Sequence, residues 1–158
     1  MSRHLTITLR LSGLLLAVAL AGCVSRPAPE RAVDVALENY VQLLRRQDAA
    51  ALSELFAPDG SLGHAGQAPI VGPAAIRAFL ESFASYKVVA HAMPVTSVSV
   101  EGNHVTQVGT YSQTVRTPDG RTIQVNGIFV AEWERQSDGR WLIRRMRTAP
   151  PGATGNGG

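Results

Sequence analysis

The spacing of the apolar residues changes near Tyr86, and this change constrains the fold more than any other feature of the sequence. In residues 30–46 and 73–83, apolar side chains recur at intervals of three and four, which places them along one side of a helix. From Tyr86 onward apolar and polar residues alternate, as they do in strands with one buried face. Helices followed by strands, rather than alternating with them, predict an α+β domain.

Helix start and stop signals set the expected boundaries in the first half of the chain. The first helix is predicted over residues 30–46, and a short second helix over residues 49–56 that is ended by Pro58-Asp59-Gly60. A short extended segment is expected over residues 61–65. A third helix starts at Pro73, a residue suited to the first turn, and its predicted core stripe is Ile76, Phe79, Leu80 and Phe83.

Three tight-turn signals divide the second half of the chain into four predicted strands. The strands are expected over residues 88–100, 104–115, 122–135 and 140–146. Successive strands joined by tight turns form an antiparallel meander. Residues 149–158 consist of Pro, Gly, Ala, Thr and Asn only, and this composition predicts a disordered tail.

The first 22 residues resemble an export signal. A positively charged start is followed by an apolar run over residues 11–20, shorter than the roughly 20 apolar residues that a membrane-spanning helix needs. Leu20-Ala21-Gly22-Cys23 then resembles the lipobox of bacterial lipoproteins, in which the leader is removed and the cysteine receives diacylglycerol and fatty acyl chains such as palmitate. A secretory signal with a chance cysteine and a buried apolar helix are the alternatives.

The lipoprotein interpretation divides the chain and predicts where the protein is found. Residues 1–22 would be the signal peptide, and residues 23–30 the lipidated cysteine and a tether to the membrane. The expected location is the bacterial cell envelope. The absence of Asp after Cys23 favours the periplasmic side of the outer membrane in a Gram-negative host.

Charge and cysteine content exclude several classes of protein. Residues 1–22 hold two of the 15 basic residues and none of the 12 acidic ones. The rest of the chain is therefore nearly neutral, without the basic surface that nucleic acid requires. One cysteine excludes an internal disulfide framework, and the histidines lack the spacing of a metal site. We expect no nucleic-acid partner, no metal and no cofactor.

Several segments are similar to the SnoaL-like and DUF4440 branch of the NTF2-like superfamily. They are residues 46–60, 70–80, 127–133 and 138–144, and the similarity extends over residues 32–148. The resemblance implies one domain over residues 31–148. Its expected fold is an NTF2-like cone, in which a strongly curved antiparallel sheet wraps about three N-terminal helices and leaves an open pocket.

The resemblance also assigns candidate catalytic residues. Ketosteroid isomerases of this superfamily use a Tyr on the first helix as a hydrogen-bond donor and an Asp beyond the second helix as a general base. Tyr40 and His64 occupy these positions here. Histidine suits proton transfer near neutrality. The acidic donor expected on the third long strand is missing, however, which weakens the case for an enzyme.

Aromatic and sulfur-containing side chains are the candidate walls of the pocket, although such residues also form ordinary cores. His91 is interpreted as a wall or face residue. The arginines of the last strand are interpreted as solvated charges or as partners of Glu132 and Glu134, and contact of one of them with an acidic ligand or an anionic lipid headgroup is the alternative. The candidate wall residues are Phe56, Phe79, Phe83, Met93, Tyr111, Phe129 and Trp133.

We interpret the chain as a non-enzymatic, membrane-anchored domain that binds a small, largely apolar ligand or a protein partner. The first alternative is a cofactor-independent isomerase or dehydratase that uses His64 as base and Tyr40 as hydrogen-bond donor. The second is a structural module that forms a homodimer through its sheet.

Overall fold

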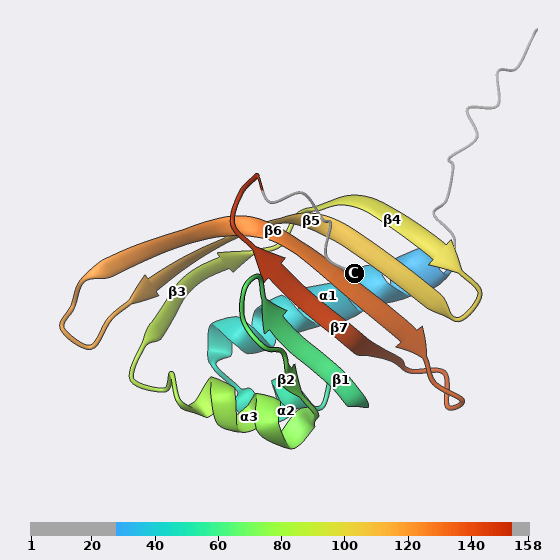
Figure 1. The fold of residues 1–158 in the computed structure, drawn as a ribbon, viewed down its shortest axis with the longest axis horizontal. Helices are drawn as coiled ribbons and strands as arrows, with labels where there is room; N and C mark the ends of the chain where they lie inside the picture. The colour runs from blue at the N-terminus through green and yellow to red at the C-terminus, as the bar shows by residue number, and fades with distance from the viewer. Residues whose placement is uncertain (1–27, 153–158) are drawn as a thin grey trace, which may run out of the picture.

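A curved seven-stranded sheet wraps three helices in the computed structural model, which describes residues 28–152 (Figure 1). The helices lie on the concave side of the sheet, and the predicted α+β cone is confirmed. No helix among the described residues is long and apolar enough to cross a membrane. In chain order the elements are α1 (Ala28–Arg46), α2 (Ala49–Ser53), β1 (Phe56–His64), β2 (Ile70–Val71), α3 (Pro73–Glu81), β3 (Lys87–Ala92), β4 (Val95–Glu101), β5 (His104–Arg116), β6 (Thr122–Arg135) and β7 (Trp141–Ala149).

The second helix is shorter than predicted because the sheet takes its last residues. The side chain of Asp48 caps α2 by accepting a hydrogen bond from an amide of the first turn at 3.0 Å, but the helix ends at Ser53. The carbonyl of Leu55 accepts a hydrogen bond from the amide of Ile143 at 2.8 Å. Phe56 then pairs with Ile143 as the first residue of β1. Pro58-Asp59-Gly60 therefore lies within β1, in its irregular part.

The sheet is mixed, and the prediction of a purely antiparallel sheet was wrong. Its strand order is β2-β1-β7-β6-β5-β3, with β4 also paired to β5. Strand β1 runs parallel to β7, with His64 opposite Thr148, whereas the other pairs of the described sheet are antiparallel. The two-residue strand β2 was not predicted. Local turn signals specify hairpins, and β1 and β7 are too far apart in sequence for a turn to join them.

The segment predicted as one strand over residues 88–100 forms two strands, β3 and β4. They are separated by Met93 and Pro94, and both pair with β5, β4 along its first half and β3 along its second half. Proline has no amide hydrogen to donate to a ladder. The carbonyl of Pro94 instead accepts a hydrogen bond from the amide of Thr110 at 3.1 Å.

The last strand is longer than predicted. Strand β7 continues to Ala149, which lies opposite Ile128, so the expected tail begins later than residue 149. Residues 153–158 lie outside the described residues, as do the predicted signal peptide and Cys23. On the exposed side of β7, Arg145 pairs with Glu132 at 2.9 Å, and Arg144 lies 3.3 Å from Glu134, as the sequence predicted.

A buried polar chain joins the first helix to the middle of the sheet. The indole N–H of Trp133 donates to the side-chain carbonyl of Gln107 at 2.9 Å. The amide nitrogen of Gln107 in turn donates to Asp34 of α1 at 2.8 Å. Gln107 is fully buried, and apolar residues such as Val33, Phe129 and Ile143 form the core with it. These contacts hold α1 in place across β5 and β6.

Candidate functional site

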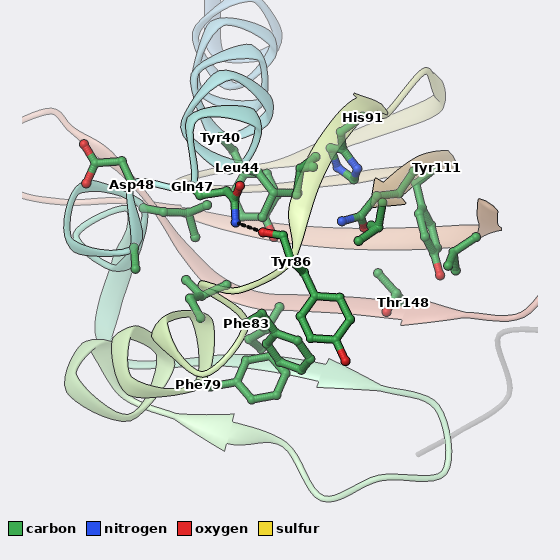
Figure 2. A pocket seen from close by; sticks show the side chains of 18 of the residues that line it. Tyr40, Leu44, Gln47, Asp48, Phe79, Phe83, Tyr86, His91, Tyr111 and Thr148 are labelled. Carbon is green, nitrogen blue, oxygen red and sulfur yellow. Dashed lines mark hydrogen bonds between the residues drawn. The ribbon is translucent and has the colours of Figure 1, made fainter. Parts of the chain in front are cut away.

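A cavity of about 700 Å³ opens between the end of α1, α2, α3 and the concave face of the sheet (Figure 2). Most of its wall is aliphatic or aromatic. The polar groups come from a few side chains on different elements. The lining residues used below are Tyr40, Asp48, His64, Phe79, Glu81, Phe83, Tyr86, His91, Met93, Tyr111, Val125 and Thr148.

The far end of the β5–β6 hairpin supplies apolar residues that the helices leave uncovered. Figure 1 shows this hairpin running past α3. Ile123 and Val125 of β6 share a face with the buried Phe129, yet they remain 44% and 40% exposed. Both line the cavity. Their exposure comes from the length of the hairpin, so the continuous apolar face on β6 serves as core at one end and as cavity wall at the other.

An aromatic group forms the rim of the cavity below the end of α1. Phe79 and Phe83 are 38% and 46% exposed, so the predicted core stripe of the third helix is buried only at Ile76 and partly at Leu80. The rings of Phe79 and Phe83 lie 5.1 Å apart, and those of Phe83 and Tyr86 lie 5.9 Å apart. The segment is tied to α1 by Gln47, whose side-chain amide donates to the Tyr86 carbonyl at 2.6 Å (Figure 2).

Tyr40 lines the cavity from α1 as a buried phenol. Its ring meets the ring of Phe56 edge-on at 6.5 Å. Burial raises the pKa of the Tyr40 hydroxyl to about 12, because the phenolate would lose its solvation. The hydroxyl is therefore neutral at physiological pH and able to donate a hydrogen bond.

His64 lines the same cavity from the end of β1, and the structure brings it together with Tyr40 there. Its Nδ1 lies 2.9 Å from the hydroxyl oxygen of Thr148, which is its neighbour across the parallel pair. Thr148 also lines the cavity. The parallel β1–β7 pairing thus orients His64, a contact that the spacing of residues in the sequence does not show.

His91 is a third polar residue in the wall, on β3. In the described part of the chain its two ring nitrogens are the only buried side-chain polar atoms without a hydrogen-bond partner. Burial, together with the positive charge of Arg45, lowers the pKa of His91 to about 4. From the sequence, His91 was predicted only to be a wall or face residue. Its position two residues before the buried Met93 was the signal that it faces inward.

The predicted aromatic wall is divided between cavity and core. Phe79, Phe83, Met93 and Tyr111 line the cavity. Three predicted wall residues belong instead to the packed core, because the helices cover the end of the sheet where they lie. These residues are Phe56, Phe129 and Trp133.

Few charges reach the cavity. Asp48 and Glu81 are the charged residues of its lining, which contains no lysine or arginine among the described residues. The described residues also contain no group of three or more His, Cys, Asp or Glu side chains able to hold a metal ion. The arrangement can surround an apolar molecule and offer it hydrogen-bonding groups from different elements of the fold.

The sequence matches one family model, and the fold is similar to those of several solved structures. A family model described as the SnoaL-like domain matches residues 28–147. A ketosteroid isomerase-like protein from Erwinia carotovora atroseptica is similar in structure, with a TM-score of 0.68 and 17% identity over 75% of this chain and 93% of that one. An NTF2-like protein with a cystatin-like fold from Novosphingobium aromaticivorans has a TM-score of 0.67 and 25% identity, over 80% and 84% of the chains. A Catenulispora acidiphila protein solved in complex with S-DNPA has a TM-score of 0.64 and 19% identity, over 77% and 92%. No curated protein matches the sequence.

Proposed function

The chain belongs to the SnoaL-like family of NTF2-like domains, and from this membership and its cavity we propose that it binds a small, neutral, largely apolar molecule. The observation that carries the proposal is the cavity of about 700 Å³ with an apolar wall. Small-molecule sites in proteins have volumes of about 300–1,000 Å³ and similar walls with few polar groups.

The charges around the cavity favour a neutral ligand over an anion. Asp48 and Glu81 would repel an anionic group, and the part of the lining that residues 28–152 provide holds no lysine or arginine to attract one. The phenol of Tyr40 and the imidazole of His91 are uncharged near neutrality. A ligand with a hydroxyl or carbonyl on an apolar body therefore suits the lining best.

Blocking the cavity with a large side chain tests this function. Val125 in the cavity and Val100 on β4 are similarly exposed, at 40% and 38%. Val125→Trp should abolish the fluorescence gain of the neutral probe N-phenyl-1-naphthylamine, whereas Val100→Trp should bind the probe like wild type. No binding by wild type, or equal binding by all three proteins, would contradict the proposal.

A second candidate function is proton transfer on the bound ligand, favoured because Tyr40 and His64 line the same cavity. Tyr40 would donate a hydrogen bond to the developing oxyanion, and His64 would act as the base. Loss of one oxyanion donor commonly costs about 10²–10³ in rate, so weak turnover of a ketosteroid is expected at most. Robust isomerisation of an unsaturated ketosteroid, abolished by Tyr40→Phe or His64→Ala, would favour the enzyme over the binding module.

We also propose that the domain acts at a membrane surface of the bacterial envelope. The support is Leu20-Ala21-Gly22-Cys23, which ends five residues before α1 begins. A tether of this length, at about 3.3 Å per residue, keeps the domain within about 17 Å of the anchor. Intact-mass analysis should find an acylated N-terminus at Cys23, and Cys23→Ser should release the protein from membranes. Recovery of a soluble chain that still carries residues 1–22 would refute the anchor.

A further inference from the structure

We propose that Tyr111 and Gln113 of β5 form a polar subsite that binds a hydroxyl group of the ligand. This inference rests on the proposed binding function and adds the two residues and the chemical group that determine specificity. It is separate from the enzyme alternative, which uses Tyr40 of α1 and His64 of β1.

The strand register places both side chains on the cavity side of the sheet. Tyr111 and Gln113 are two positions apart on β5, so they share a face, and both line the cavity. Gln113 lies opposite His91 of β3 and Val125 of β6, which line the cavity as well. Two residues of a strand span only about 7 Å. The phenol and the amide therefore belong to the same stretch of the wall.

The position of the Tyr111 ring is set by Gly127 of β6. The two residues are paired across β5 and β6. A Cβ at position 127 would lie 2.5 Å from Cε1 of the Tyr111 ring, so the ring occupies the space that a side chain there would fill. Figure 2 shows the hydroxyl at the far end of this ring, in the cavity and pointing toward the strand that carries Thr148.

The polar atoms of both side chains are open to the cavity. Neither the hydroxyl of Tyr111 nor the amide of Gln113 has a hydrogen-bond partner within residues 28–152. In the same part of the chain, the buried polar atoms without a partner are confined to the ring nitrogens of His91, which are enclosed. The polar atoms of Tyr111 and Gln113 therefore keep accessible surface, although Tyr111 as a whole is only 8% exposed. A ligand can reach them without breaking a hydrogen bond of the protein.

The chemistry of the two groups selects a hydroxyl. The Tyr111 hydroxyl can donate and accept, and the Gln113 amide has N–H donors and a carbonyl acceptor. A ligand hydroxyl also donates and accepts, so it matches both groups in either direction, whereas an ether or ketone oxygen only accepts. The carboxylates of Asp48 and Glu81 in the same lining disfavour an acidic group.

The wall next to the subsite is apolar and suits the rest of the ligand. Ile123 and Val125 lie on the same face of β6 as Gly127, and both line the cavity with large exposed fractions. Val125 is directly opposite Gln113. A flat ring that packs on these aliphatic side chains brings a substituent on its edge to the subsite. The ligand class is therefore a neutral ring compound with a hydroxyl on its edge.

Two probes that differ in one hydroxyl test the inference on the purified full chain. Isothermal titration calorimetry would compare 2-naphthol with 2-methylnaphthalene, in which a methyl group of similar size replaces the hydroxyl. We expect Tyr111→Phe and Gln113→Met each to weaken 2-naphthol about 2- to 10-fold, the usual range for one neutral hydrogen bond, and to leave 2-methylnaphthalene unchanged. Thr110→Val is the matched control, because it removes a hydroxyl from an exposed position of β5 outside the cavity.

The other outcomes separate the subsite from the function beneath it. Equal effects of Tyr111→Phe on the two probes, or no effect on either, would overturn the subsite and leave the binding function standing. Wild type that binds N-phenyl-1-naphthylamine but neither naphthalene probe would also overturn the subsite alone. Wild type that binds none of the three would overturn both.

A measurement on the wild type needs no stable variant. The ¹³Cζ resonance of a tyrosine responds to hydrogen bonding of its hydroxyl. Addition of 2-naphthol should shift the Tyr111 signal more than addition of 2-methylnaphthalene does. Equal shifts by the two probes, or shifts confined to Tyr40 and Tyr86, would refute the inference.

Discussion

Lowering the pH from 7.5 to 5 should destabilise the wild-type protein more than a His91→Phe variant. His91 has a pKa of about 4 in the folded protein, against 6.5 for a solvated histidine. Between these values the unfolded chain binds a proton that the folded chain does not, so stability falls as pH falls. The effect is absent above about pH 6.5 and complete only below about pH 4. Phenylalanine keeps a ring of similar shape but has no proton to bind.

The size of this effect follows from the pKa difference. One pKa unit corresponds to about 1.4 kcal/mol, so a fall from pH 6.5 to pH 5 costs the wild type about 2 kcal/mol relative to His91→Phe. The surrounding charges act in both directions. Arg45 of α1 opposes protonation of His91. Asp34 and Glu38 of α1, which line a second hollow with Arg45 and His91 between α1 and the β3–β4 break, would favour protonation.

Urea denaturation at pH 7.5, 6.5, 5.5 and 5.0 measures the difference, with the free energy of unfolding extrapolated to water for each protein. Taking the difference between the two proteins cancels the titration of groups they share, such as Asp119 and Asp138. His104→Phe is the control for removal of a histidine and should follow the wild type at each pH. A wild-type curve parallel to that of His91→Phe over the whole range would refute the argument that His91 is buried in its neutral form.

Three further predictions concern the fold around the cavity, and urea denaturation checks each. Gln107→Leu should cost about 1–3 kcal/mol, because it removes the carbonyl that accepts from the buried indole N–H of Trp133 and the amide that donates to Asp34. Ile76→Ala should lower the free energy of unfolding by about 2–5 kcal/mol, because Ile76 is fully buried. Phe79→Ala should lower it clearly less, since Phe79 is 38% exposed. Equal losses for the two variants would contradict the assigned core. Gly127→Ala should lower the free energy of unfolding by about 1–3 kcal/mol, because a Cβ there collides with the carbonyl of Ala149 in β7 and with the Tyr111 ring. The same change should weaken probe binding. Unchanged stability and binding would contradict this packing.

Much of the fold could be predicted because its elements follow local rules. Gly72-Pro73 marked the start of α3, and the turn signals at 118–120 and 137–139 marked both ends of β6, which the structure confirms at Thr122–Arg135. Helical spacing predicted α1 to within two residues. These features depend on backbone preferences and on the period of apolar residues, both of which can be determined from neighbouring positions alone.

The errors arose where a distant segment competes with a local preference. Residues 54–56 were predicted as helix, but hydrogen bonds to β7 end α2 at Ser53. Phe79 and Phe83 have the spacing of a core stripe, yet none of the described elements covers them fully, and they form the cavity rim. Periodicity shows which residues share a face, but the length and curvature of other elements decide whether that face is buried.

The sequence by itself therefore determined the order and type of the elements, the α+β class and the family, because each depends on local pattern and on motifs along the chain. Only the tertiary structure decided the site. The parallel pairing of β1 with β7 places His64 beside Thr148. The break at Pro94 separates β3 from β4, and His91 lies on β3 in the cavity wall with no hydrogen-bond partner within residues 28–152. Whether a polar side chain has a partner depends on atoms contributed by remote strands and helices, and no local pattern encodes that.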